Sequence, residues 1–169
     1  MGNKNNTDSK KYDMAELKVT AIDMLKRRGV ELIDIAEIVQ LIQIDYHPDL
    51  SIEKCLYNVD ADLSKREVIH CILTGIAIDE LAEKKLLPEP LQSIIDSDES
   101  LYGLDEILPL SIVNIYGTIG LTNFGYLDKE KIGIIKKLDT QKDGQCNTFL
   151  DDIVAGIAAA AASRIAHAQ

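Results

Sequence analysis

The sequence predicts an all-α protein, a single-domain helical bundle with a buried central helix. Apolar residues recur at i, i+3, i+4 and i+7 through most of the chain, and no run alternates with period two for long enough to form a strand. At 169 residues the chain has the length of one domain with a sizeable core. We therefore expect one helical domain at residues 12–169, preceded by a disordered, Asn- and Lys-rich tail at residues 1–11.

The first half of the chain contains four amphipathic patterns of helical spacing, each followed by a turn signal such as Gly29 or Pro48. Their apolar positions lie at residues 14–25, 35–42, 55–63 and 68–81. Pro88 and Pro90 bound a short helix, and an acidic turn follows at residues 96–100. The first half therefore predicts helices only.

The second half contains an uncharged stretch, residues 107–127, which at 21 residues is long enough to span a membrane. Pro109, three glycines and several Ser, Thr and Asn side chains interrupt its apolar character. We therefore expect a central helix buried on all sides by other helices. A shorter helix at 129–138 and a polar loop at 139–147 lead to the last helix, residues 148–166.

The last helix has a thin face, because Gly156 and a run of alanines recur at helical spacing with Ile153 and Ile157. Two adjacent carboxylates, Asp151 and Asp152, open this helix. Water, a lysine or a cation from elsewhere in the fold must neutralise them. For Asp151 alone, a capping box with Thr148 is the structural alternative.

The formal net charge of −10 argues against a nucleic-acid partner and permits a divalent cation. The three cysteines, at 55, 71 and 146, lack a Cys-x-x-Cys pattern and indicate reduced thiols in the cytosol. Residues 139–144 begin like a calcium loop, but the twelfth position is Leu150 where a glutamate is needed. We therefore do not expect a calcium site.

Two further acidic sites stand at ends of apolar helices. Asp105 and Glu106 open the uncharged stretch, and Asp128 follows it with Lys131 three residues later. Taken singly, these could be a helix-end pair of acids and a surface ion pair. Packing the helices together would gather up to five carboxylates and a lysine at one end of the core, where hard oxygen ligands favour Mg²⁺.

The order of these motifs resembles the phosphatidylglycerophosphatase A family. Its signature is D-E, then D-x-x-K, then D-D-x-x-A-G, here at Asp105, at Asp128 and at residues 151–156. The resemblance covers residues 101–164. The proline and tryptophan residues usual after Lys131 are replaced here by Ile132-Gly133-Ile134-Ile135, and the membrane spans of many members are missing. The chain is therefore similar to a shorter, soluble branch.

The resemblance implies a Mg²⁺-dependent phosphatase that converts phosphatidylglycerophosphate to phosphatidylglycerol. Asp105, Asp128 and Asp152 are then metal ligands. Asp151 or Glu106 orients the attacking water, and Lys131 holds a phosphate oxygen in the substrate site. Two alternatives remain: a phosphatase for a soluble phosphate or pyrophosphate ester, and a metal-binding helical interaction protein with a vestigial site.

A lipid substrate and the absence of a convincing span predict a cytoplasmic protein that contacts the inner membrane face transiently. Because the net charge opposes binding to anionic lipid, contact must come from a local basic or apolar patch. The pairs Lys136-Lys137 and Arg27-Arg28 are candidates. A homo-oligomer is compatible with the sequence.

Overall fold

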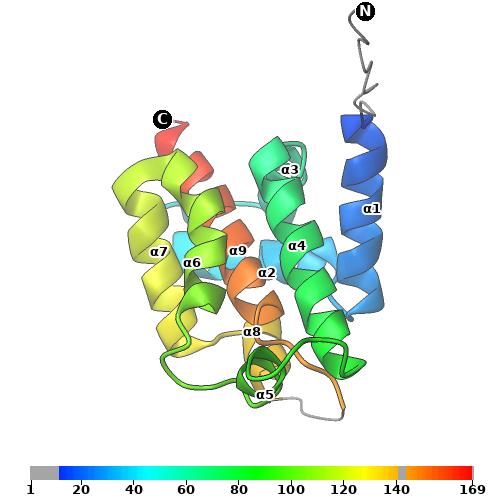
Figure 1. Cartoon of the computed structure of the whole chain (residues 1–169). Coiled ribbons are helices and arrows are strands. Elements are labelled where there is room, and N and C mark those ends of the chain that lie inside the picture. The colour runs from blue at the N-terminus through cyan, green and yellow to red at the C-terminus, as the bar shows by residue number, and fades with distance from the viewer. Residues whose placement is uncertain (1–11, 141–143, 169) are drawn as a thin grey trace, which may run out of the picture.

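Helix α9 (Leu150–His167) is enclosed by the other helices along most of its length (Figure 1). The computed structural model describes residues 12–140 and 144–168, so the tail predicted at residues 1–11 lies outside the described residues. Every residue of α9 from 150 to 163 is buried. The buried central helix of the bundle is therefore α9, and not the stretch 107–127 to which the sequence analysis assigned that place.

The described residues form helices joined by short loops and contain no strand, which confirms the all-α, single-domain fold. The other helices differ in length, and one short 3₁₀ helix, η1, stands between two of them. They are α1 (Met14–Arg27), α2 (Leu32–Gln43), α3 (Ile52–Asp62), α4 (Arg66–Glu83), α5 (Leu91–Asp96), α6 (Leu104–Val113), η1 (Asn114–Tyr116), α7 (Gly117–Glu130) and α8 (Ile134–Thr140).

The uncharged stretch at 107–127 does not form the single, fully enclosed helix that the sequence predicts. It is broken at η1 and folds back, so α6 and α7 lie side by side against α9 (Figure 1). Gly117 has a φ of 64°, which few residues other than glycine adopt. A Cβ on Gly120 would lie 2.7 Å from the carbonyl oxygen of Val113, so glycine permits the tight return.

Only the inner faces of the two arms are buried. By length and hydropathy alone, the segment Leu104–Glu130 could cross a membrane. Only 28% of its most apolar window is buried, which is less than an enclosed core helix would show. Because of the break, its arms are 10 and 14 residues long, or about 15 and 21 Å at 1.5 Å per residue. Neither arm reaches the ~30 Å hydrocarbon thickness of a bilayer.

Small residues on α9 let neighbouring helices approach closely, as the sequence predicts. A Cβ built on Gly156 would lie 2.9 Å from Cβ of Pro109 on α6. On the other side, a Cβ on Gly75 of α4 would lie 2.2 Å from Cδ1 of Ile153. The core is therefore sensitive to single added methyl groups.

We predict that Gly156→Ala destabilises the protein by about 1–3 kcal/mol, because Pro109 is too rigid to yield to the added methyl group. The matched control is Gly125→Ala on the exposed side of α7, where nothing lies within 4 Å of the added atom. This change should be neutral or stabilise by up to about 1 kcal/mol through helix propensity. Urea unfolding measures both. Equal effects of the two changes would contradict the close packing of α6 on α9.

Candidate active site at the start of helix α9

A single ammonium group joins three carboxylates from two helices. Nζ of Lys131 lies 2.9 Å from Oδ1 of Asp128, 2.8 Å from Oδ2 of Asp151 and 3.0 Å from Oδ1 of Asp152. Lys131 follows α7 directly and has a left-handed backbone with a φ of 46°. Its side chain is therefore a cation paired with the acids that open α9, one of the partners that the sequence predicted for them.

The first turn of α9 is capped by a buried carboxylate from another helix. Asp79 of α4 is fully buried, and it accepts hydrogen bonds from the backbone N–H groups of Phe149, at 3.1 and 3.3 Å, and Leu150, at 3.0 Å. The hydroxyl of Thr148 instead donates to the carbonyl oxygen of Ile95. The capping box considered for Thr148 and Asp151 is therefore not formed, and the carboxylate of Asp151 is free to bind Lys131.

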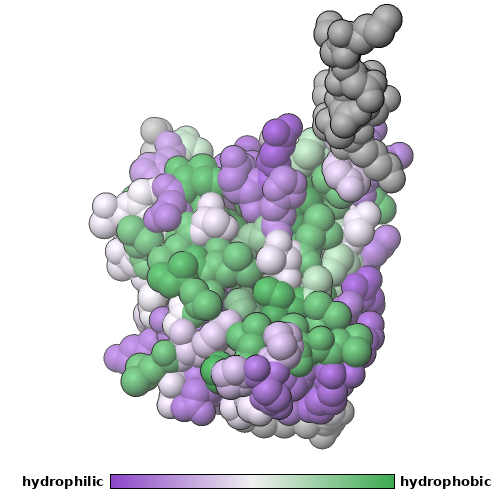
Figure 2. All heavy atoms as spheres, in the orientation of Figure 1, coloured by the Kyte–Doolittle hydropathy of each residue, from purple (hydrophilic) through white to green (hydrophobic). Residues whose placement is uncertain are grey.

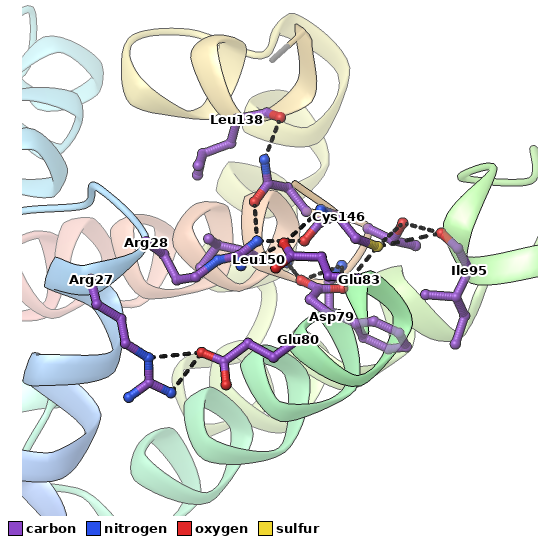
Figure 3. Close-up of polar contacts among 12 residues, drawn as sticks. Arg27, Arg28, Asp79, Glu80, Glu83, Ile95, Leu138, Cys146 and Leu150 are labelled. Carbon is purple, nitrogen blue, oxygen red and sulfur yellow. Dashed lines mark hydrogen bonds and ion pairs between the residues drawn. The ribbon is translucent and has the colours of Figure 1, made fainter. Parts of the chain in front are cut away.

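A buried arginine ties the loop before α9 to the rest of the fold (Figure 3). Arg28 donates to Oε1 of Glu83 and to the carbonyl oxygen of Cys146, both at 2.6 Å, and to Oδ1 of Asn147 at 2.9 Å. Arg27 pairs with Glu80. Arg28 is thus not available at the surface, and Arg27-Arg28 is wrong as a membrane-binding patch.

The helical hairpin brings the remaining predicted acids to the same end of the bundle. Glu106 lies near enough to Asp128, Asp105 and Lys131 for their charges to act on it. Its pKa is raised, by burial first and then by the charges of Asp128 and Asp105. Asp105 makes no bond to Lys131, and its Oδ1 is a buried oxygen with no hydrogen-bond partner. All six predicted site residues therefore belong to the ends of α6, α7 and α9.

The electrostatics of this cluster are strained by burial. Burial, and then the charge of Asp151, raises the pKa of Asp152 to about 8, and Lys131 only partly offsets this. Burial raises the pKa of Asp151 to about 6. Burial opposes the charge on Lys131, but Asp151 and Asp152 outweigh it and raise the pKa of the ammonium. Burial therefore favours the neutral forms of Asp151 and Asp152, and pairing with Lys131 offsets this only in part.

The carboxylates of the cluster are chemically suited to bind a hard divalent cation, but their present arrangement does not form a metal site. In residues 12–140 and 144–168, no three acidic, histidine or cysteine side chains are already gathered as a metal site, and Lys131 lies among the acids. The unpartnered oxygen of Asp105 and the raised pKa of Asp152 both indicate a shortage of positive charge. Carboxylate oxygens are the ligands that Mg²⁺ prefers.

A cavity of about 370 Å³ adjoins the cluster at Asp151. Among the described residues, its lining is rich in acids and contains one lysine, Lys85, which pairs with Asp96. The residues around it come from the ends of α4, α5 and α8 and from the loop before α9. The acidic cluster is thus open to small molecules on one side.

These features define an all-α protein that gathers carboxylates around a lysine at one end of a buried helix. The sequence model of the phosphatidylglycerophosphatase A family matches residues 22–167, and the chain belongs to this family. This confirms the resemblance inferred from the three acidic motifs.

The relatives are similar over nearly their whole length. The uncharacterized protein YpjQ of Bacillus subtilis (strain 168) is 65% identical over 158 residues, covering 94% of this chain and 89% of that protein. The crystal structure of ypjQ superposes with a TM-score of 0.89 over 92% of this chain and 96% of that one. The low temperature requirement C protein of Listeria monocytogenes is 55% identical with a TM-score of 0.88, covering 92% and 98%.

Sequence reasoning missed Asp79, and it considered Arg28 only as part of a surface patch, not for the buried hydrogen bonds that it makes. Asp79 falls three residues after Ile76 and seven after Ile72, so it lies on the apolar face of its helix. A lone acid on such a face signals a buried partner. The identity of that partner, two backbone N–H groups 70 residues later, is not visible in the pattern.

We predict that Asp79→Ala destabilises the protein by about 1–3 kcal/mol, because two buried N–H groups of α9 lose their acceptor. The neighbouring Glu80→Ala removes only a partly exposed ion pair with Arg27 and should cost less than about 1 kcal/mol. Thermal and urea unfolding compare the two. If both variants are equally stable, Asp79 does not cap α9.

Stability without divalent metal should fall as pH rises from about 5 to about 8. Folding raises the pKa of Asp152 and Asp79 from 3.8 to about 8, so the folded state binds protons that the unfolded state releases. Unfolding in EDTA across this range measures the slope, and Asp152→Asn should reduce it. A wild-type stability that rises with pH over this window, or an unchanged slope in the variant, would contradict the assignment.

Proposed function

We propose that this protein is a Mg²⁺-dependent phosphatase acting on a phosphate monoester, with conversion of phosphatidylglycerophosphate to phosphatidylglycerol as the favoured reaction. Membership of the phosphatidylglycerophosphatase A family supports the reaction class. The observation that carries the proposal is the cluster itself: Asp128, Asp151 and Asp152 are held around Lys131 and are short of positive charge.

Each side chain has a role that its position permits. Asp105, Asp128 and Asp152 would hold Mg²⁺, which supplies charge neutralisation for the phosphate and for the attacking water. Asp151 or Glu106 would orient that water, and Lys131 would donate to a phosphate oxygen. Water adds to phosphorus, the bond to the alcohol oxygen breaks, and the alcohol takes up a proton. The described residues that line the cavity beside Asp151 could receive part of the substrate.

The protein would act in the cytoplasm and reach its lipid substrate by transient contact with the inner membrane face. Lys136 and Lys137 are exposed on α8 and remain candidates for a basic contact. A homo-oligomer stays open, and no nucleic-acid partner is proposed because of the net charge of −10.

Two alternatives each have an observation in their favour. A soluble phosphate ester fits the short arms of the hairpin, neither of which spans a bilayer. A vestigial, non-catalytic site fits the present position of Lys131, which occupies the place between the acids. Phosphate release from lipid and from soluble esters, with Mg²⁺ and with EDTA, separates these possibilities.

Asp152→Asn should reduce phosphatase activity by orders of magnitude, because it removes a buried ligand that acts on the charge of the transition state. Without metal, the variant should be as stable as the wild type or more stable by up to about 1 kcal/mol, because repulsion with Asp151 is relieved. Mg²⁺ should raise the unfolding temperature of the wild type more than that of the variant.

The matched control is Glu130→Gln, an exposed acid directly before Lys131, which should keep activity and metal response. Near wild-type hydrolysis by Asp152→Asn would show that the acids are structural.

A further inference from the structure

The hairpin of α6, η1 and α7 carries an apolar outer face that the fold does not use. Leu104 and Ile107 lie one turn apart on α6 and Ile115 lies on η1, with 55%, 58% and 44% of their surfaces exposed. Leu121 on α7 is 43% exposed. Figure 2 shows hydrophobic residues gathered over the region of α6. Scattered exposed apolar residues are ordinary in proteins, but several large ones on one hairpin indicate an interaction surface.

Packing within the molecule does not explain these side chains. The inner face of α6 already supplies Pro109, Ile112 and Val113 to the core, and α7 supplies Phe124 and Leu127. The outer face carries no charge between residues 107 and 127. A surface in water would ordinarily hold charged residues over this length, so the outer face is suited to a partner without charge.

This outer face ends at the candidate site. Leu104 and Ile107 flank Asp105 and Glu106, and Asp128 lies in the last turn of the other arm, α7. The exposed Tyr126 stands beside this second end, as tyrosines do where apolar and aqueous environments meet. A partner seated on the hairpin would therefore border the acidic cluster.

We propose that the outer face of the α6–η1–α7 hairpin, made by Leu104, Ile107, Ile115 and Leu121, lies on the surface of a phospholipid bilayer during turnover. This inference rests on the proposed function, because a lipid phosphate must be brought to the cluster. With a net charge of −10, two copies of the chain repel each other, which favours a bilayer over a second copy. Attachment through apolar side chains is insensitive to salt, unlike attachment through Lys136 and Lys137.

The test is sedimentation of the full chain with phosphatidylcholine vesicles at low and high salt. The wild type should bind at both, and the double variant Ile107→Gln, Ile115→Gln should bind at least tenfold more weakly. The matched control is Leu41→Gln on α2, a leucine exposed by 61% outside the hairpin, which should bind like the wild type. Circular dichroism of each variant verifies that the helices are retained.

Activity separates this inference from the proposed function. Phosphate release from a short water-soluble ester should be unchanged in the double variant, and release from vesicle-embedded lipid should fall at least tenfold. If no ester is hydrolysed by the wild type while vesicle binding still depends on the hairpin, the proposed function fails and the docking surface stands.

Three results would overturn the docking surface. The first is that the wild type does not bind vesicles. The second is binding that is lost at high salt or on replacing Lys136 and Lys137. The third is a dimer in analytical ultracentrifugation that the double variant dissociates while vesicle binding is unaffected, which would assign the hairpin to a second copy.

Discussion

Two carboxylates enter the core at the first turn of helix α9, and much of the structure follows from their burial. The helix can be central only because its side chains are small, so that α6 approaches Gly156 through Pro109. Burying its first turn then leaves backbone N–H groups and two acids away from water, each of which needs a partner. Asp79 accepts from the N–H groups and Lys131 binds the acids. Close packing and charge neutralisation thus depend on the same helix.

The candidate site also depends on the reversal of the chain at η1. A straight helix over residues 107–127 would hold its two ends about 30 Å apart at 1.5 Å per residue. Asp105 and Asp128 could not then share a site. The positive φ of Gly117 and the bare Cα of Gly120 fold the stretch back, so both ends meet at the start of α9. The same fold-back leaves one side of each arm uncovered by the part of the chain that the structure describes.

Local patterns predicted much of this arrangement, and long-range contacts account for what they missed. Helical spacing found the helices, and the small residues near Gly156 identified a closely packed final helix. The acidic motifs gave the residues that meet at one end. The break at η1 was missed because the proline of the stretch, Pro109, lies inside α6 while the chain turns at Gly117. The cap from Asp79 was missed because its partner is 70 residues away. Backbone strain and distant partners leave no periodic signal.

The position of Lys131 constrains how a phosphate could be handled. A lysine ammonium has three N–H donors, and here Asp128, Asp151 and Asp152 accept from all of them. No donor remains for a phosphate oxygen. Before Lys131 could turn to a phosphate, another positive charge would have to replace it among the acids, because unpaired buried carboxylates strongly destabilise the folded protein. The proposed roles of Lys131 and of a divalent cation are therefore linked: the lysine can contribute to phosphate binding only when the acids are neutralised by something else.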